Sequence, residues 1–259
     1  MYFGTILKMD LYKLLKKKTT YLLFLTLLVP IIFAVGMNID ISFLVTDGER
    51  SFDIISVDGV SALQFTANML SQSNYIIYLV IVVIASMAVA NEFETGQIRL
   101  YAVRICERTK MIMSKIISLY FMILGYFVIF CLFSIGMYYL FVADSQYGNG
   151  TLFLDSMNSV LYIVVTMVGI MVILTITVFL GLLLKTFHCF AVSYLVWFIS
   201  KYLSFFDNLK MLIPDNCADI IMAEGIGSIQ FIKLFAIYIS YIIMMSFLSC
   251  YVLYRKDIK

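Results

Sequence analysis

Residues 157–184, MNSVLYIVVTMVGIMVILTITVFLGLLL, include no charged side chain. A membrane-spanning helix needs about 17–25 mostly apolar residues, because each residue advances a helix by only about 1.5 Å. Residues 116–142 form a second long stretch without charge. These two stretches predict an all-α membrane protein.

The composition of the whole chain agrees with that prediction. Hydrophobic residues make up 63% of the 259 positions and charged residues 13%, whereas soluble domains average about 45–50% and about 25%. A soluble fold of this size could not hide so much apolar surface from water. The two prolines do not mark a linker, so residues 1–259 are expected to form a single transmembrane domain.

Six stretches have the length and hydropathy of a membrane span. They lie near residues 21–37, 75–90, 116–142, 157–184, 187–206 and 234–254. The second is short and is expected to borrow residues from its flanks. The fifth contains Lys201 near one end, where the long side chain can reach the membrane interface.

Basic residues are distributed unevenly between the two sides of this topology. The side that holds both termini and the second and fourth loops carries 14 of the 18 lysines and arginines. The other side holds only Arg50, Lys201, Lys210 and Lys233. Because basic loops stay in the cytoplasm, we expect both termini to be cytoplasmic in a multi-pass plasma-membrane protein.

The first 20 residues precede the first span. Their apolar side chains recur every three or four positions: Phe3, Ile6, Leu7, Leu11, Leu14 and Leu15. Lys13, Lys16 and Lys17 lie largely off that stripe, as in a helix that lies in the membrane interface and faces anionic headgroups. The alternative is a simple basic anchor that only fixes the topology.

Catalytic and metal sites are not expected in this chain. It has no GxxxxGK[ST] phosphate loop, and its one histidine, His188, has no neighbouring carboxylate with which to bind a metal. No Asp or Glu falls in the middle of a predicted span, where proton-driven transporters and intramembrane proteases need one. We therefore expect a protein that is not itself an enzyme.

The loop after the second span is the most informative polar segment. It begins Glu92-Phe93-Glu94-Thr95-Gly96-Gln97-Ile98-Arg99-Leu100. Gly96 is expected to break it into two short helices, the first capped by Glu92 and Glu94. The segment suits docking into a groove of another protein, but a solvated loop whose arginines only set the topology fits the spacing equally well.

This pattern, followed by Arg108-Thr109-Lys110 and by Lys115 at the next span, resembles the ABC-2 type permeases of ATP-binding-cassette exporters. The basic amphipathic start and the six spans also match that family. The chain departs from it in lacking the proline that the family often has shortly before Arg108.

The resemblance implies a permease subunit that pairs with a second copy or a homologue and is driven by two cytosolic ABC ATPase subunits. ATP and magnesium would bind to those partners, and no cofactor or nucleic acid to this chain. Residues expected to couple the permease to the ATPase are Glu92, Phe93, Glu94, Gly96, Arg99, Arg104, Glu107, Arg108, Lys185 and His188. The family also implies short re-entrant extracellular helices, here within Phe205–Glu224.

The charge-free spans favour a hydrophobic or amphipathic substrate such as a peptide, an antibiotic or a lipid-like molecule. By analogy, a small permease of this composition is similar to bacterial peptide-export or antimicrobial-peptide-immunity systems. Two alternatives are a six-span substrate-binding subunit of a vitamin importer and an intramembrane enzyme.

Overall fold

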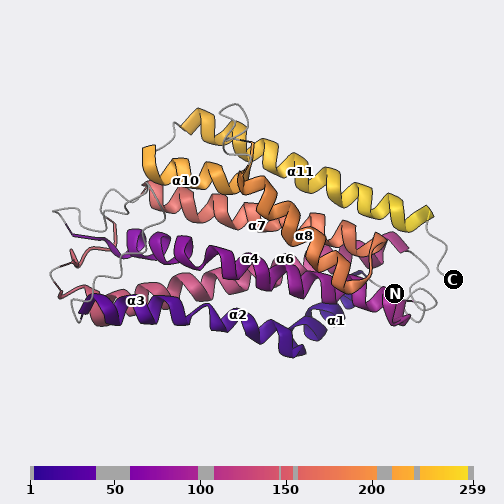
Figure 1. The fold of residues 1–259 in the computed structure, drawn as a ribbon, viewed down its shortest axis with the longest axis horizontal. Helices are drawn as coiled ribbons and strands as arrows, with labels where there is room; N and C mark the ends of the chain where they lie inside the picture. Colours follow the sequence, from indigo (N-terminus) through magenta and orange to yellow (C-terminus); the bar gives the residue numbers. More distant parts are fainter. Residues whose placement is uncertain are drawn as a thin grey trace.

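A computed structural model describes residues 3–38, 59–98, 108–145, 147–153, 157–202, 212–224 and 228–255. They form a bundle of long helices that run side by side (Figure 1). Apart from one isolated bridge between Val60 and Gly148, these residues contain no strand. The all-α expectation is therefore confirmed for the described part of the chain.

The helices follow one another in a simple order along the chain. They are α1 (Phe3–Lys16), η1 (Lys18–Tyr21), α2 (Leu22–Leu25), α3 (Leu28–Asn38), α4 (Ala62–Glu94), α6 (Arg108–Met137), the π-helical turn η2 (Tyr138–Val142), α7 (Met157–Leu183), α8 (Thr186–Tyr202), α10 (Pro214–Glu224) and α11 (Ser228–Arg255). Helix α1 confirms that the amphipathic start is helical.

Five segments of the described chain are long and apolar enough to cross a membrane. They are Lys18–Asn38, Ala62–Glu94, Thr109–Val142, Met157–Leu183 and Gln230–Arg255. The expected fifth span corresponds to α8, which has 17 residues and so lies at the short end of the range of about 17–25. A total of six spans stays a prediction.

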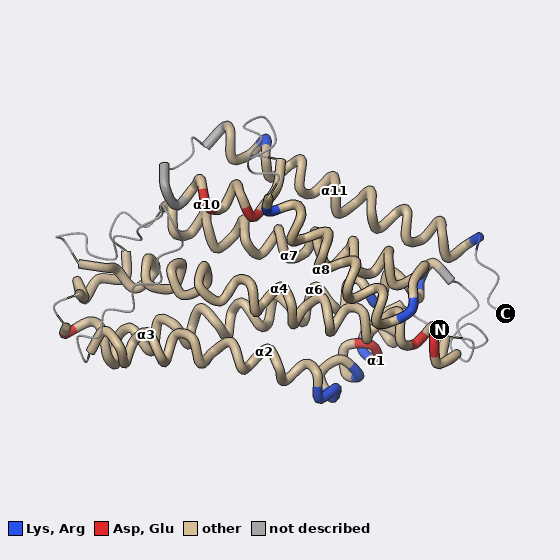
Figure 2. The backbone as a smooth tube through the Cα atoms, viewed as in Figure 1, with Lys and Arg blue, Asp and Glu red and all other residues tan. Residues whose placement is uncertain are grey.

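The two termini lie at the same end of the bundle, which we call the termini end (Figure 1). Helices α4 and α7 pack against each other at the centre, α1 packs against α6, and α10 and α11 pack on α7. Of the five candidate spans, α4 is the most buried and the C-terminal span the least. Figure 2 shows charged residues gathered near the termini end, with another group around α10 and the start of α11.

Helix α4 is much longer than the sequence predicts. The second span was predicted only near residues 75–90, but α4 begins at Ala62, where the Ser61 side chain accepts a hydrogen bond from Gln64 N at 3.3 Å. The polar run that ends in Ser73 and Asn74 lowers the local hydropathy without ending the helix. The Ser73 hydroxyl donates to Met69 O at 2.8 Å within the helix. The side chains of Ser73 and Asn74 are both buried against neighbouring helices.

The first hydrophobic segment is interrupted between α2 and α3. Pro30 lacks the amide hydrogen that would bond to Thr26 O, and its ring disfavours a continuous helix at that point. Thr26 O accepts instead from Val29 N at 3.2 Å, and the Thr26 hydroxyl hydrogen-bonds to Leu23 O and to the Tyr126 hydroxyl. The interruption is thus fixed locally by proline and held to α6 by a buried side-chain contact.

The expected re-entrant region is described only in part. Residues 205–211 lie outside the described residues, and α10 accounts for most of the rest. Pro214 opens α10 at the first helical position, where its missing amide hydrogen has no intrahelical partner to lose. Helix α10 packs along α7.

Candidate functional site

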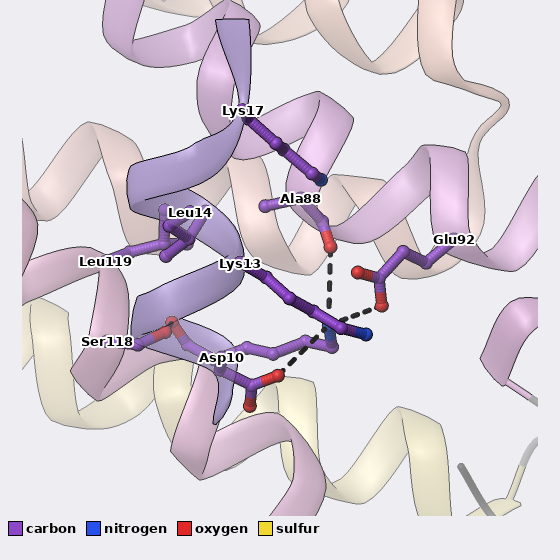
Figure 3. Close-up of a pocket in the computed structure, with 9 residues that line it drawn as sticks. Asp10, Lys13, Leu14, Lys17, Ala88, Glu92, Ser118 and Leu119 are labelled. Carbon is purple, nitrogen blue, oxygen red and sulfur yellow. Dashed lines mark hydrogen bonds and ion pairs between the residues drawn. The ribbon is translucent and has the colours of Figure 1, made fainter. Parts of the chain in front are cut away.

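Charged side chains line a small space inside the bundle at the termini end, among them Asp10, Lys13, Lys17 and Glu92 (Figure 3). Lys115 of α6 donates a hydrogen bond to Glu92 Oε2 of α4 at 2.5 Å, and another to Ala88 O at 3.4 Å. Its Nζ also lies 4.0 Å from Asp10 Oδ1 of α1. We call Asp10, Glu92 and Lys115 the buried charge cluster, and it joins three helices that are far apart in sequence.

All three residues of this cluster are 4–5% exposed. Asp10 reaches it because it lies on the same face of α1 as Ile6 and Leu14, at four-residue spacing. The Ser114 hydroxyl donates to the second carboxylate oxygen of Asp10 at 2.7 Å. The apolar face of α1 therefore includes one carboxylate, and that carboxylate is fully engaged with α6.

Burial shifts the pKa values of two groups in this region, Asp10 and Lys17. Burial raises the pKa of Asp10 above its ordinary value, although the positive charge of Lys115 and the Ser114 hydrogen bond act in the opposite direction. Burial also lowers the pKa of Lys17, whose Nζ donates to Met87 O at 3.1 Å. The groups surround a cavity of about 10 Å³, close to the smallest that holds one water.

The buried charge cluster links three helices rigidly. Removing one member of a buried ion pair leaves an unpaired charge, which typically costs about 3–5 kcal/mol. Helices α1, α4 and α6 are therefore held in one arrangement at this end. Within the part of the chain that the structure describes, no group of three or more His, Cys, Asp or Glu side chains is placed to hold a metal ion.

A second contact at the same end joins the two loops that the sequence singled out. The Glu94 carboxylate accepts hydrogen bonds from Thr186 N at 3.2 Å and from the Thr186 hydroxyl at 2.7 Å. Glu94 ends α4 and Thr186 begins α8. A carboxylate from one helix thus caps the first turn of another, where the unpaired amides and the helix dipole favour negative charge.

The remaining predicted site residues are placed as follows. Phe93 is half-buried against the apolar core, and Lys185 and His188 are exposed beside the start of α8. Arg108 begins α6. Arg99, Arg104 and Glu107 lie outside the described residues.

The start of the loop differs from expectation in one respect. Glu92 and Glu94 were expected to cap a separate short helix, but both belong to the last turn of α4. Glu92 points inward to Lys115 because the helix continues past the apolar span and turns that side toward α6. The expected break at Gly96 is confirmed, since this residue has φ +71° directly after the end of α4.

Sequence reasoning missed Asp10, Ser114 and Lys17 as members of this region. One signal was available, because Asp10 is the only acidic residue among the first 20 and falls on the apolar stripe. A lone acid at such a position needs a buried partner. Its partner, Lys115, could not be identified from the local sequence.

Long apolar helices packed side by side in the described part of the chain define an all-α, multi-pass membrane protein. The chain belongs to the family described as "protein of unknown function (DUF2705)", whose model matches residues 31–259. No curated protein matches the sequence.

Proposed function

We propose that this chain is the permease subunit of a bacterial ATP-binding-cassette exporter of the ABC-2 type. It pairs with a second copy or a homologue in the plasma membrane, and two cytosolic ATPase subunits drive the pair. The substrate is a hydrophobic or amphipathic molecule such as a peptide, an antibiotic or a lipid-like compound. Magnesium and ATP bind to the ATPases.

One observation carries this proposal. The Glu94–Thr186 contact places the end of α4 directly beside the start of α8. The loop after α4 therefore starts next to the loop before α8. A partner that docks at the termini end can therefore press on both loops together. An ATPase that closes on binding ATP needs such a surface to move several helices at once.

The buried charge cluster connects this docking surface to the helices inside the bundle. Glu92 lies two residues before Glu94 on α4 and is tied to Lys115 of α6 and, through it, to α1. A displacement of the docking surface would consequently move α1, α4 and α6 as a unit. In this proposal Glu92 transmits the motion from inside the bundle, while Glu94, Lys185 and His188 lie at or near the surface.

The proposed topology has six spans, with α8 as the fifth, and cytoplasmic termini. Two observations support it. Both termini lie at one end of the bundle (Figure 1), and that end carries the lysine-rich helix α1. Basic residues flanking spans are retained in the cytoplasm.

The test is to purify the tagged chain from its native bacterial membranes in mild detergent and to identify what stays bound. We expect a protein with a GxxxxGK[ST] phosphate loop, at one copy per permease chain, and ATP hydrolysis by the complex. Replacing Glu94 by Ala together with Thr186 by Val removes both hydrogen bonds between the loops. This double variant should keep normal membrane levels but lose ATPase binding or substrate-stimulated hydrolysis.

The matched control is Lys256→Ala, in the C-terminal tail, which should behave like the wild-type chain. A purified chain that carries no ATPase at all would overturn the proposal. A double variant that both binds the ATPase normally and keeps substrate-stimulated hydrolysis would instead show that the loops only set the topology.

A further inference from the structure

A cavity of about 420 Å³ lies between α7, α8, α10 and α11. Ligand-binding pockets usually measure about 300–1,000 Å³. Its walls are predominantly apolar and include Val172 and Ile176 of α7, Val196 of α8, and Met244 and Met245 of α11. The cavity is therefore large enough for a ligand, and its apolar lining favours a hydrocarbon ligand.

The position of the cavity along the helices indicates whether lipid or water surrounds it. Val172 and Ile176 lie in the central part of α7, and Met244 lies near the middle of α11. Both helices are candidate membrane spans, so the cavity lies at the depth of the hydrocarbon core. Val196 and Met244 are 37% and 52% exposed, which places an opening on the outer surface of the bundle, where lipid would be.

The one carboxylate in the wall is already satisfied by the protein. Asp215, at the start of α10, accepts hydrogen bonds from Tyr78 Oη at 2.8 Å and Asn74 Nδ2 at 3.3 Å on one oxygen. Its other oxygen accepts from Trp197 Nε1 at 2.7 Å. Because both oxygens are engaged, Asp215 fixes α10 as a wall of the cavity and does not require a polar ligand.

We propose that this cavity holds one acyl chain of a membrane phospholipid. Water is disfavoured because an apolar cavity offers it too few hydrogen-bond partners. A flexible alkyl chain at this depth enters from the side and packs against methionine side chains, which adapt to irregular shapes. The site lies within one chain, away from the termini end, and does not depend on the proposed transport function.

The experiment uses the purified full chain in phosphatidylcholine vesicles that contain a small fraction of phosphatidylcholine with a diazirine in the middle of one acyl chain. After photolysis, peptide mapping by mass spectrometry locates the crosslinks. We expect them to concentrate at the lining residues of α7 and α11, which are Val172, Ile173, Ile176, Tyr241, Met244 and Met245. Labelling spread evenly over the exposed face of α11, for example at Phe247, would overturn the proposal.

Two substitutions fill the cavity from opposite walls, namely Ile176→Trp and Met244→Trp. Each should reduce crosslinking within the cavity severalfold. Met244 is already half exposed, so its replacement should fold even if Ile176→Trp does not. The matched control is Ile243→Trp, because Ile243 is 63% exposed and does not line the cavity.

Unchanged crosslinking in Met244→Trp, with a normal elution profile on size exclusion, would contradict the assignment. A loss of crosslinking in Ile243→Trp equal to that in Met244→Trp would do the same. The vesicles contain no ATPase, so either result leaves the proposed function to its own test.

Discussion

The bundle buries carboxylates in two regions and stabilises them in different ways. At the termini end, Asp10 and Glu92 share the ammonium group of Lys115. Halfway along α4, Asp215 accepts hydrogen bonds from neutral donors on Asn74, Tyr78 and Trp197. The positive charge of Lys201 also acts on it, without a direct ion pair. Both regions join helices that are distant in sequence, but only the first does so through an ion pair in direct contact.

The two regions differ in the donors that contact the carboxylates. At the termini end, lysine side chains keep long apolar stems in the interior and reach an acidic partner. Around Asp215, tyrosine and tryptophan bring a hydrogen-bond donor on a large apolar ring, which is cheaper to bury than a charge. The termini end should therefore be sensitive to changes of charge, and the Asp215 region to changes of shape and hydrogen bonding.

The largest effect is expected from Lys115→Met. This variant removes the cation that contacts both carboxylates and leaves only Lys13 and Lys17 as positive charges around the same cavity. The free energy of unfolding should fall by about 3 kcal/mol, the lower end of the range for a broken buried ion pair. Thermal unfolding in detergent would measure the loss. Lys110→Met is the control, because Lys110 is an exposed lysine at the start of the same helix.

Combining Lys115→Met with Glu92→Leu should recover part of the lost stability, since replacing both charges by apolar groups is often neutral. If Lys115→Met unfolds at the wild-type temperature, the buried charge cluster does not stabilise the packing of α1, α4 and α6.

A smaller effect is expected from Asp215→Ala. Three buried donors lose their acceptor, but the cost of burying the carboxylate disappears as well, so the net loss should be about 1–3 kcal/mol. Trp197 is the only tryptophan in the chain, so its fluorescence reports directly on the broken hydrogen bond. We expect a shifted emission maximum in Asp215→Ala and a smaller shift in Asp215→Asn, which keeps one acceptor oxygen. Identical emission in all three proteins would contradict the observed contact.

The smallest effect is expected from Gly169→Ala on α7. A Cβ atom at this position would lie 2.9 Å from Pro214 Cβ and 2.9 Å from the Tyr78 hydroxyl oxygen. Both distances are shorter than a van der Waals contact. The loss should be about 1 kcal/mol, the lower end of what overpacking costs, because the change adds only one methyl group. The same substitution at Gly125, where no atom lies within 4 Å, should be neutral or slightly stabilising. Equal stabilities of the two variants would argue against the close packing of α10 on α7.

The sequence by itself determined where the apolar helices lie. Helix α7 was predicted at 157–184 and is observed at Met157–Leu183, because the length and hydropathy of a span are properties of consecutive residues. The same local reasoning failed at the start of α4. There, polar residues such as Asn74 are buried by contacts with other helices, and local hydropathy does not contain those contacts.

Only the tertiary structure decided how the charges are used. Glu92 was predicted as part of a docking surface, but its partner is Lys115, 23 residues away. Asp215 lies outside every predicted span, yet it bonds to the middle of α4 across 137 residues. Pairings over such distances depend on which helix faces meet in the folded bundle, and the periodicity of a single helix cannot specify that choice.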